Sequence, residues 1–301
     1  LRRESYLKEE KELFPEGFYI ARLGAQHHYN TGLDGVALVT SLGFTTSPRF
    51  TFSEGGNSIT GIGSDGLPFV IVGHDTLGAT RAIYKRWVVG FSDWDLSKQN
   101  QFMIRALAMD YGVLEEKVYP VEQPSTYHLD MSLSLVGPQT VMLNDSLQAA
   151  YASFEYMDLS ASAKIYLVQR ALIKKKHEDQ TELDLKKHGF HVRRVVGSIE
   201  DPMRRGKLAI NFFNSIQFSK EDGTKGIIML RGDESLNKIM EAEYWQNKSP
   251  IKVLREFGVS EDHFHFISDR VSSEILKLDG GISCCSKNLH LDTFLSLRGK
   301  S

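Results

Sequence analysis

A mixed α/β fold is what this sequence predicts. Short apolar runs of strand length alternate along the 301 residues with stretches of helical periodicity. Glycine and proline stand at the ends of several of these stretches, where turns are expected. No low-complexity segment and no clear sequence repeat interrupts the alternation. The pattern alone therefore indicates a chain of mixed α and β elements and leaves its topology open.

The first predicted elements are a buried strand and the helix that follows it. Residues 68–73 form an apolar run between a proline and a glycine, which is typical of a buried strand. A helix is predicted over 97–112, with Ser97 as its cap and Gly112 at its end. The next elements are a short strand over 117–121 and a hairpin whose arms, 128–136 and 140–143, flank a Gly-Pro turn.

Residues 146–189 form a mainly helical, strongly charged segment. Its charges fit a solvated helix face with a loop, and they also fit an insertion that docks a partner protein. Both interpretations stay open from the sequence. The later predicted elements are strands over 191–196 and 264–267, a hairpin of 208–217 and 226–230, helices over 237–246 and 250–257, and a final strand that carries Cys284.

Composition excludes several classes of function. Hydrophobic residues make up 41% of the chain, which is a globular value, and the net charge is only −2. Because no basic tract dominates, we expect no nucleic-acid partner. No apolar run approaches the length of a membrane span and no signal peptide is visible, so we expect no membrane partner either.

Cysteine usage indicates a reducing compartment. The only two cysteines, Cys284 and Cys285, are adjacent and cannot build a disulfide framework. This fits the cytoplasm. A secreted protein whose signal lies outside this sequence is the alternative, and the oligomeric state is not predicted.

Three short motifs occur in a fixed order along the chain. The first is Glu54 followed by two glycines, the second is a His-x-Asp formed by His128 and Asp130, and the third is a Gly-Gly-x-x-Cys that ends at Cys284. A fourth marker is the pair of apolar segments 207–215 and 226–230, of which the first is rich in asparagine. Each motif alone is weak evidence for a protein family, but the occurrence of all of them in this order is strong evidence for one.

Together these motifs resemble the guanidino-group-modifying (pentein) superfamily. It comprises arginine and agmatine deiminases, dimethylarginine hydrolases, peptidyl-arginine deiminases and amidinotransferases. The resemblance covers roughly residues 2–289, so it implies a single pentein-like catalytic domain over 1–301. It also implies a five-bladed α/β propeller of ββαβ modules around a central active site. A second guanidinium-binding aspartate of the family is not found here, since Asp34 lacks its Arg-Asp context. We therefore expect part of the first module to lie upstream of Leu1.

The resemblance gives Cys284 the role of nucleophile. A thiolate is soft and is stabilised by a cationic substrate, so it suits attack on a guanidinium carbon. A lone cysteine is otherwise most often a small buried apolar side chain. Cys285 follows on the same strand and must face away from its neighbour, so we assign it to packing.

His128 and Asp130 are the acid–base and guanidinium-binding candidates. An imidazole can protonate a leaving amine and later deprotonate the incoming water. Because the two residues lie two apart on a predicted strand, their side chains should share one face. A carboxylate matches the paired N–H groups of a guanidinium, so Asp130 should bind the substrate.

Three further residues complete the predicted site. Glu54 resembles the family glutamate that lies beside the histidine, and it is assigned both catalysis and substrate binding. The two glycines after it would let the backbone approach the site closely. Asn57 and Asn214 are assigned to substrate binding. Asn57 fits neither deiminase pattern, and a turn asparagine is its alternative role.

The function that follows is a deiminase-type hydrolase acting on arginine or an arginine derivative. Its substrate would be a small guanidino compound or peptidyl-arginine, and its intermediate a covalent thiouronium on Cys284. No metal and no organic cofactor is implied. The alternatives are an amidinotransferase with the same nucleophile and a non-catalytic pentein-fold binding or effector module.

Overall fold

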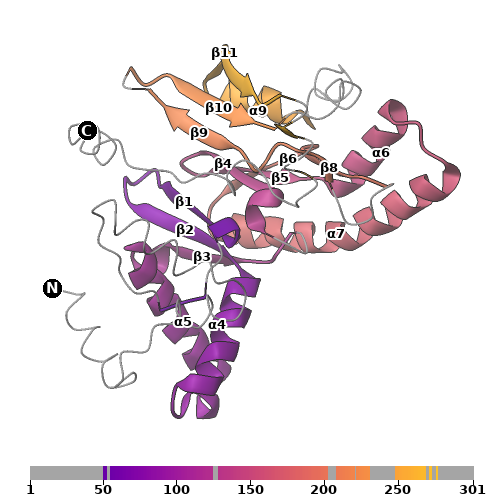
Figure 1. Cartoon of the computed structure of the whole chain (residues 1–301). Coiled ribbons are helices and arrows are strands. Elements are labelled where there is room, and N and C mark those ends of the chain that lie inside the picture. The colour runs from indigo at the N-terminus through magenta and orange to yellow at the C-terminus, as the bar shows by residue number, and fades with distance from the viewer. Residues whose placement is uncertain are drawn as a thin grey trace.

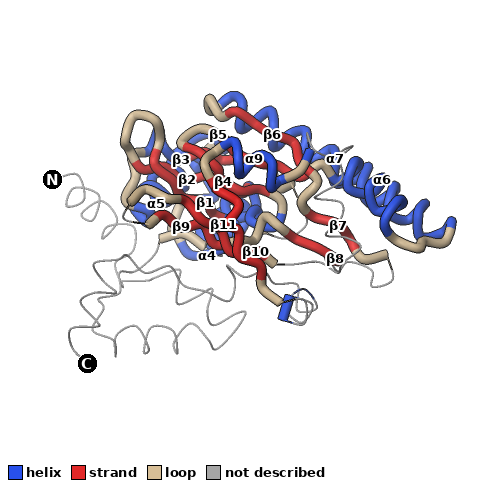
Figure 2. Tube along the Cα trace, turned by 90° about the horizontal axis from the view of Figure 1, so that it is seen from above, coloured by secondary structure: helices blue, strands red, loops and turns tan. Residues whose placement is uncertain are grey.

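The computed structural model describes residues 50–52, 55–124, 128–202, 208–220, 222–230 and 248–268, together with 271, 272 and 276. Across these residues, strands and helices form a mixed α/β arrangement (Figure 1), as the sequence predicts. The described strands form three three-stranded sheets and one two-stranded pair. Seen from above, the sheets lie near one another while α6 and α7 extend to one side (Figure 2).

Each three-stranded sheet is one ββαβ unit. An antiparallel pair is followed by one or two helices, after which the third strand returns parallel to the middle strand. A parallel return requires a crossover connection, which the helices supply. The first unit consists of β1 (Ser58–Ile62), β2 (Pro68–Gly73), α4 (His74–Trp87), α5 (Leu96–Tyr111) and β3 (Val118–Val121). The second unit consists of β4 (Leu133–Gly137), β5 (Thr140–Asn144), α6 (Ser146–Tyr156), α7 (Ala161–Lys187) and β6 (His191–Val195). The described elements of the third unit are β9 (Ile216–Ser219), β10 (Lys225–Met229), α9 (Pro250–Glu256) and β11 (Val259–Phe266).

Short elements connect these units. The strands β7 (Ser198–Glu200) and β8 (Leu208–Asn211) form an antiparallel pair between the second and third units. The described 3-10 turns are η1 (Gly55–Asn57), η2 (Phe91–Asp93), η3 (Glu115–Lys117) and η4 (Leu129–Met131). Repetition of the ββαβ unit agrees with the predicted module, and the five-bladed ring itself stays a prediction.

The strand β2 joins two hydrophobic clusters. Val70 and Val72 face the helices α4 and α5, whereas Phe69 and Ile71 pack on the opposite side against the second unit. All four are buried, because alternate residues of a strand point to opposite faces. The second cluster also contains Leu129 of η4, which is fully buried. Burial of Leu129 therefore anchors the segment that carries His128 and Asp130 in the core between two sheets.

Four predicted element boundaries are wrong. The strand predicted over 264–267 is β11, which begins already at Val259. The helix α5 begins at Leu96, and its cap is Asp95 instead of Ser97, because the Asp95 carboxylate accepts the backbone N–H of Lys98 at 2.8 Å. The predicted strand over 128–136 begins only with β4 at Leu133. The predicted strand over 208–217 is two strands, since β8 pairs with β7 whereas β9 pairs with β10. The predicted helix over 237–246 lies outside the described residues.

The charged segment 146–189 is helical, as predicted, and its longer helix also makes buried contacts. The Glu178 side chain is fully buried and forms an ion pair with Arg194 of β6 at 2.9 Å. Its carboxylate also accepts the Ser146 hydroxyl at 2.5 Å and the Ser146 backbone N–H at 3.1 Å. Burial raises the pKa of the Glu178 carboxyl above its ordinary value of 4.5, against the hydrogen bond from Ser146 and the charge of Arg194, which lower it.

Loss of the Glu178 carboxylate should destabilise the protein strongly. Glu178→Ala leaves the buried Ser146 N–H without this acceptor and takes the nearest carboxylate from the largely buried Arg194, which keeps only Asp179 and Glu182 at 3.6 and 3.8 Å. Breaking such a pair costs on the order of 3 kcal/mol. Glu256→Ala is the matched control, because the Arg193–Glu256 pair is 40% exposed on both sides. That change should cost less than about 1 kcal/mol. Urea unfolding measures both, and equal losses would contradict a buried role for Glu178.

Candidate functional site

Four of the six predicted site residues lie within the described part of the chain. Asn57 ends η1, His128 immediately precedes η4, and Asp130 lies within η4. Asn214 lies in the loop between β8 and β9. Glu54 and Cys284, with the adjacent Cys285, lie outside the described residues.

Gly56 and His128 are in direct contact. A Cβ atom built on Gly56 would lie 2.3 Å from Nδ1 and 2.4 Å from Cγ of His128. No side chain fits in that space, so the η1 backbone packs against the imidazole. Gly56 thus lies against His128, and the role of this place as a catalytic site stays a prediction. This contact places the segment immediately after Glu54 beside the acid–base candidate.

Hydrogen bonds to Asn57 connect η1 with Gln123 and with η4. The Asn57 side-chain oxygen accepts the Gln123 side-chain N–H at 2.7 Å and the backbone N–H of Leu129 at 3.2 Å. The side chain is 8% exposed, so both bonds are shielded from water. Asn57 therefore positions the residue next to His128. Its predicted contact with substrate stays a prediction.

The backbone at His128 and Asp130 turns and does not continue as a strand. The His128 carbonyl accepts the Met131 N–H at 3.2 Å, and the Leu129 carbonyl accepts the Ser132 N–H at 3.0 Å. These bonds form the 3-10 turn η4, so the predicted sharing of one strand face by His128 and Asp130 is wrong. The turn replaces a strand because Asn57, 72 positions earlier, accepts the Leu129 N–H, while the N–H groups of Met131 and Ser132 are used within the turn. His128 and Asp130 are each half-buried.

Asp130 and Asn214 join across 84 residues of sequence. The Asn214 amide nitrogen donates to the Asp130 carboxylate at 2.7 Å. Asn214 is fully buried. The structure thus brings together one residue of the His-x-Asp motif and one of the asparagine-rich segment. Gly56, His128, Asp130 and Asn214 form a chain of neighbours drawn from three separate stretches of sequence.

Sequence reasoning missed two residues at this place, Gln123 and Asn211. Gln123 is 5% exposed and donates to Asn57. Asn211 is fully buried, and its side-chain oxygen accepts the backbone N–H groups of Phe213 and Asn214 at 2.9 and 3.3 Å. The repeated Asn in the Asn-Phe-Phe-Asn run was a usable signal for Asn211, because two amides so near buried aromatic residues need partners. No local pattern distinguishes Gln123.

The segment between β3 and His128 is also tied to α7. The Glu122 carboxylate lies between two histidines. One oxygen is 3.5 Å from His74 Nδ1, and the other is 3.2 Å from His177 Nδ1. The Glu122 backbone N–H donates to Asp184 at 2.8 Å, and its carbonyl accepts the Thr181 hydroxyl at 2.9 Å. The long helix thereby fixes the segment that leads to the site.

Among the described residues, no group of three or more His, Cys, Asp or Glu side chains is arranged to hold a metal ion.

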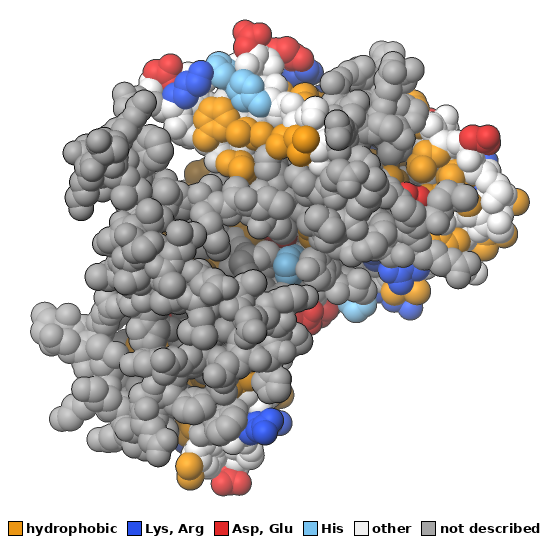
Figure 3. Space-filling model, in the orientation of Figure 1, with side chains coloured by type: hydrophobic (Ala, Val, Ile, Leu, Met, Phe, Trp, Pro, Cys, Tyr) orange, Lys and Arg blue, Asp and Glu red, His pale blue; other side chains and the backbone are white. Residues whose placement is uncertain are grey.

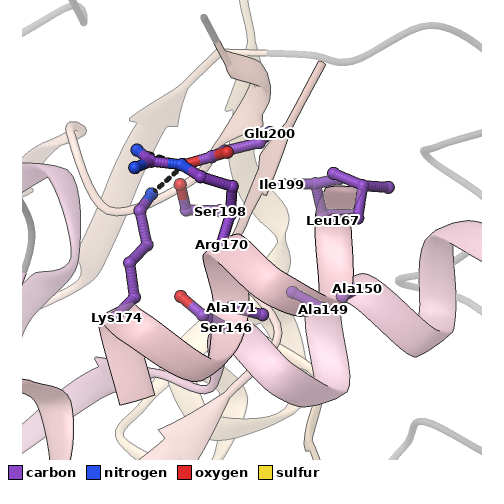
Figure 4. A pocket seen from close by; sticks show the side chains of 10 residues that line it. All are labelled: Ser146, Ala149, Ala150, Leu167, Arg170, Ala171, Lys174, Ser198, Ile199 and Glu200. Carbon is purple, nitrogen blue, oxygen red and sulfur yellow. Dashed lines mark hydrogen bonds and ion pairs between the residues drawn. The ribbon is translucent and has the colours of Figure 1, made fainter. Parts of the chain in front are cut away.

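A polar pocket lies elsewhere, between α6, α7 and β7. Arg170 and Lys174 both point toward Glu200 (Figure 4), and Lys174 Nζ lies 2.6 Å from the carboxylate. The pocket encloses about 290 Å³ including its open mouth. The remaining lining residues are Ser146, Ala149, Ala150, Leu167, Ala171, Ser198 and Ile199. None of the predicted site residues lines it.

The surface over β9–β11 shows hydrophobic and histidine side chains together (Figure 3). His265 is exposed and stacks on Phe218 at 6.0 Å between ring centroids, while His263 contacts Lys220 and Ser260. Within the described segments, no helix combines the length and the hydrophobicity that a bilayer crossing needs.

A methyl group at Gly56 should displace His128 and lower activity. Gly56→Ala forces the added carbon against the imidazole ring, and a shift of about 1 Å at a catalytic group can cost roughly 10²-fold in rate. Gly78→Ala is the matched control, because a Cβ there meets nothing within 4 Å. It lies inside α4, where alanine should be neutral or stabilising. Turnover of both variants checks this, and a fully active Gly56→Ala would contradict the contact.

Comparison with known proteins finds structural likeness alone. No family model and no curated protein matches the chain. The C. jejuni agmatine deiminase is similar at a TM-score of 0.46 and 13% identity, over 86% of this chain and 61% of that chain. A cysteine-to-serine variant of C. jejuni agmatine deiminase with substrate bound is similar at 0.40 and 11%, over 76% and 54%. The chain thus spans less than two thirds of the length of either structure.

Proposed function

We propose that this protein is a deiminase-type hydrolase acting on the guanidino group of arginine or an arginine derivative. Cys284 is the nucleophile, His128 the proton carrier, and Asp130 and Glu54 hold the guanidinium. No metal and no organic cofactor takes part. The substrate is a small guanidino compound or an arginine side chain of a peptide.

The reaction divides into two halves that use the same histidine. The Cys284 thiolate attacks the guanidinium carbon and forms a C–S bond, and His128 then donates a proton to the departing nitrogen. The C–N bond breaks and ammonia leaves a covalent thiouronium. Water attacks the same carbon while His128 removes its proton, and the C–S bond breaks to give the ureido product and free Cys284. Atoms and charge balance without a redox partner.

One observation supports this proposal above the others. Motif residues that are far apart in sequence are neighbours in the fold, namely Gly56 against His128 and Asp130 against Asn214. Their chemistry suits the reaction, since a half-buried imidazole and a half-buried carboxylate lie two positions apart in the sequence, at a turn that hydrogen bonds fix. A carboxylate fixed in this way can bind a planar cation in one orientation.

A substrate panel tests the proposal directly. The protein is incubated with arginine, agmatine, methylarginine and an arginine-containing protein, and the release of ammonia and of ureido product is measured. We expect ammonia and ureido product in equal amounts from one member of the panel. Transfer of the amidino group to an added amine without ammonia would assign the protein to the amidinotransferases. Binding of a guanidino compound without any product would assign a binding module.

A further inference from the structure

The buried asparagine pair Asn211 and Asn214 has no counterpart in the reaction written above. We propose that Asn214 is a positioning residue that fixes the Asp130 carboxylate, and that Asn211 in turn fixes Asn214. This inference rests on the proposed function for its catalytic meaning. It replaces direct substrate contact by Asn214 with action through Asp130.

The orientation of the Asn214 amide follows from its partner. A carboxylate accepts hydrogen bonds, so the nitrogen and not the oxygen of the amide must face Asp130. At 2.7 Å this is a short, charge-assisted hydrogen bond, the stronger class of such bonds. It holds one carboxylate oxygen and thereby sets the plane in which Asp130 faces a guanidinium.

The loop that carries Asn214 is fixed independently of any ligand. Asn211 accepts the backbone N–H groups of Phe213 and Asn214 with one side-chain oxygen, and its nitrogen contacts the Met131 sulfur at 3.3 Å. Met131 is the residue after Asp130, so Asn211 and Asn214 contact two adjacent residues of the same short turn. Phe212 and Phe213 between the asparagines are buried in a hydrophobic cluster to which the second unit, the β7–β8 pair and the third unit all contribute.

The aromatic residues explain why the loop cannot move freely. The Phe213 ring occupies the space above Gly197, where a Cβ would lie 2.7 Å from the ring. The Phe212 N–H donates to the Gly197 carbonyl at 2.8 Å. The buried rings of Phe212 and Phe213 thus keep the side-chain amides of the flanking asparagines next to Asp130. Because buried amides are costly unless they are bonded, such an arrangement favours a positioning role.

A double-mutant cycle on ligand binding separates positioning from direct contact. Affinities for arginine and agmatine are measured by calorimetry in the Cys284→Ala background, which prevents turnover. Asn214→Ala should weaken binding about 10- to 100-fold, as expected for loss of a charge-assisted hydrogen bond. Asn100→Ala is the matched control. Asn100 of α5 accepts a side-chain hydrogen bond from Arg81 of α4, and neither residue contacts Asp130 through this bond. It should leave affinity unchanged.

The cycle is closed with Asp130→Asn. If Asn214 acts through Asp130, Asn214→Ala should add little to the loss already caused by Asp130→Asn. Full additivity of the two losses would overturn the proposal, because it means that Asn214 acts on the ligand by itself. Unchanged affinity in Asn214→Ala would overturn it as well.

A titration needs no ligand and keeps the inference separate from the proposed function. The Asp130 carboxyl is followed by ¹³C NMR in wild type, Asn214→Ala and the nearly isosteric Asn214→Asp. The carboxyl pKa of Asp130 should be higher in Asn214→Ala, because the charged form loses a hydrogen bond. In Asn214→Asp it should rise further, because two carboxylates this close share a proton.

The two failures are distinguishable. If wild type binds no guanidino compound while Asp130 titrates as expected, the proposed function fails and the positioning contact stands. An Asp130 titration that is the same in all three proteins would overturn the positioning contact, whatever the protein binds. Asn214→Asp keeps the test valid even where the alanine variant folds poorly.

Discussion

Cys284→Ala should abolish turnover of the guanidino substrate, whereas Cys285→Ala should retain most of it. Without the thiol no covalent thiouronium forms, and water alone cannot attack the guanidinium carbon at a useful rate. On the strand that the sequence predicts here, adjacent residues would face opposite ways, so only one of the two thiols would reach the substrate. Release of ammonia by the two variants and wild type at matched concentration is the measurement.

Cys285→Ala is the natural control for Cys284→Ala, because both variants lose one thiol at the same place in the sequence. Circular dichroism on both confirms that folding is equal. If Cys285→Ala is the inactive variant, the order of the two cysteines is reversed. If both variants keep wild-type turnover, the covalent mechanism is wrong.

His128→Ala should lower kcat by about 10²- to 10⁴-fold and change substrate affinity much less. In the proposed mechanism the imidazole moves protons in both halves of the reaction, whereas carboxylates hold the guanidinium. The measurement is steady-state turnover over a range of substrate concentrations, with substrate affinity determined separately in the Cys284→Ala background.

The matched control is His191→Ala, since His191 is exposed at the start of β6. It should be fully active. A loss of less than tenfold in His128→Ala would mean that another group carries the protons. A large rise in KM at unchanged kcat would assign His128 to binding.

Long apolar elements were predictable from this sequence because burial dictates their pattern. The strand β2 reads as a continuous apolar run since both of its faces are packed, and it has the predicted bounds. Gly112 ends α5 with a φ of 64°, which glycine adopts without strain. The short strands β1 and β7 were missed because they have little apolar pattern of their own and are defined by their partners.

One contact of the candidate site agrees with the sequence prediction, the local geometry differs from it, and the identity of the site stays a prediction. Asp130 and Asn214 were assigned to one site from the sequence, and they form a hydrogen bond in the structure. The 3-10 turn at His128 could not be predicted, since it depends on a hydrogen bond from Leu129 to Asn57, 72 positions away. Asn211 and Gln123 support the site from buried positions, and a single sequence gives no measure of such long-range pairing.

Covalent labelling with 2-chloroacetamidine tests the central claim most directly. This reagent carries an amidine cation like the substrate, so it should alkylate the thiol that faces the guanidinium site. Fragment spectra of the peptide that contains both cysteines locate the added mass. We expect the label on Cys284, slowed by the substrate that the panel identifies and lost in Cys284→Ala. Label confined to Cys285, or alkylation at a rate that substrate does not slow, would contradict the account.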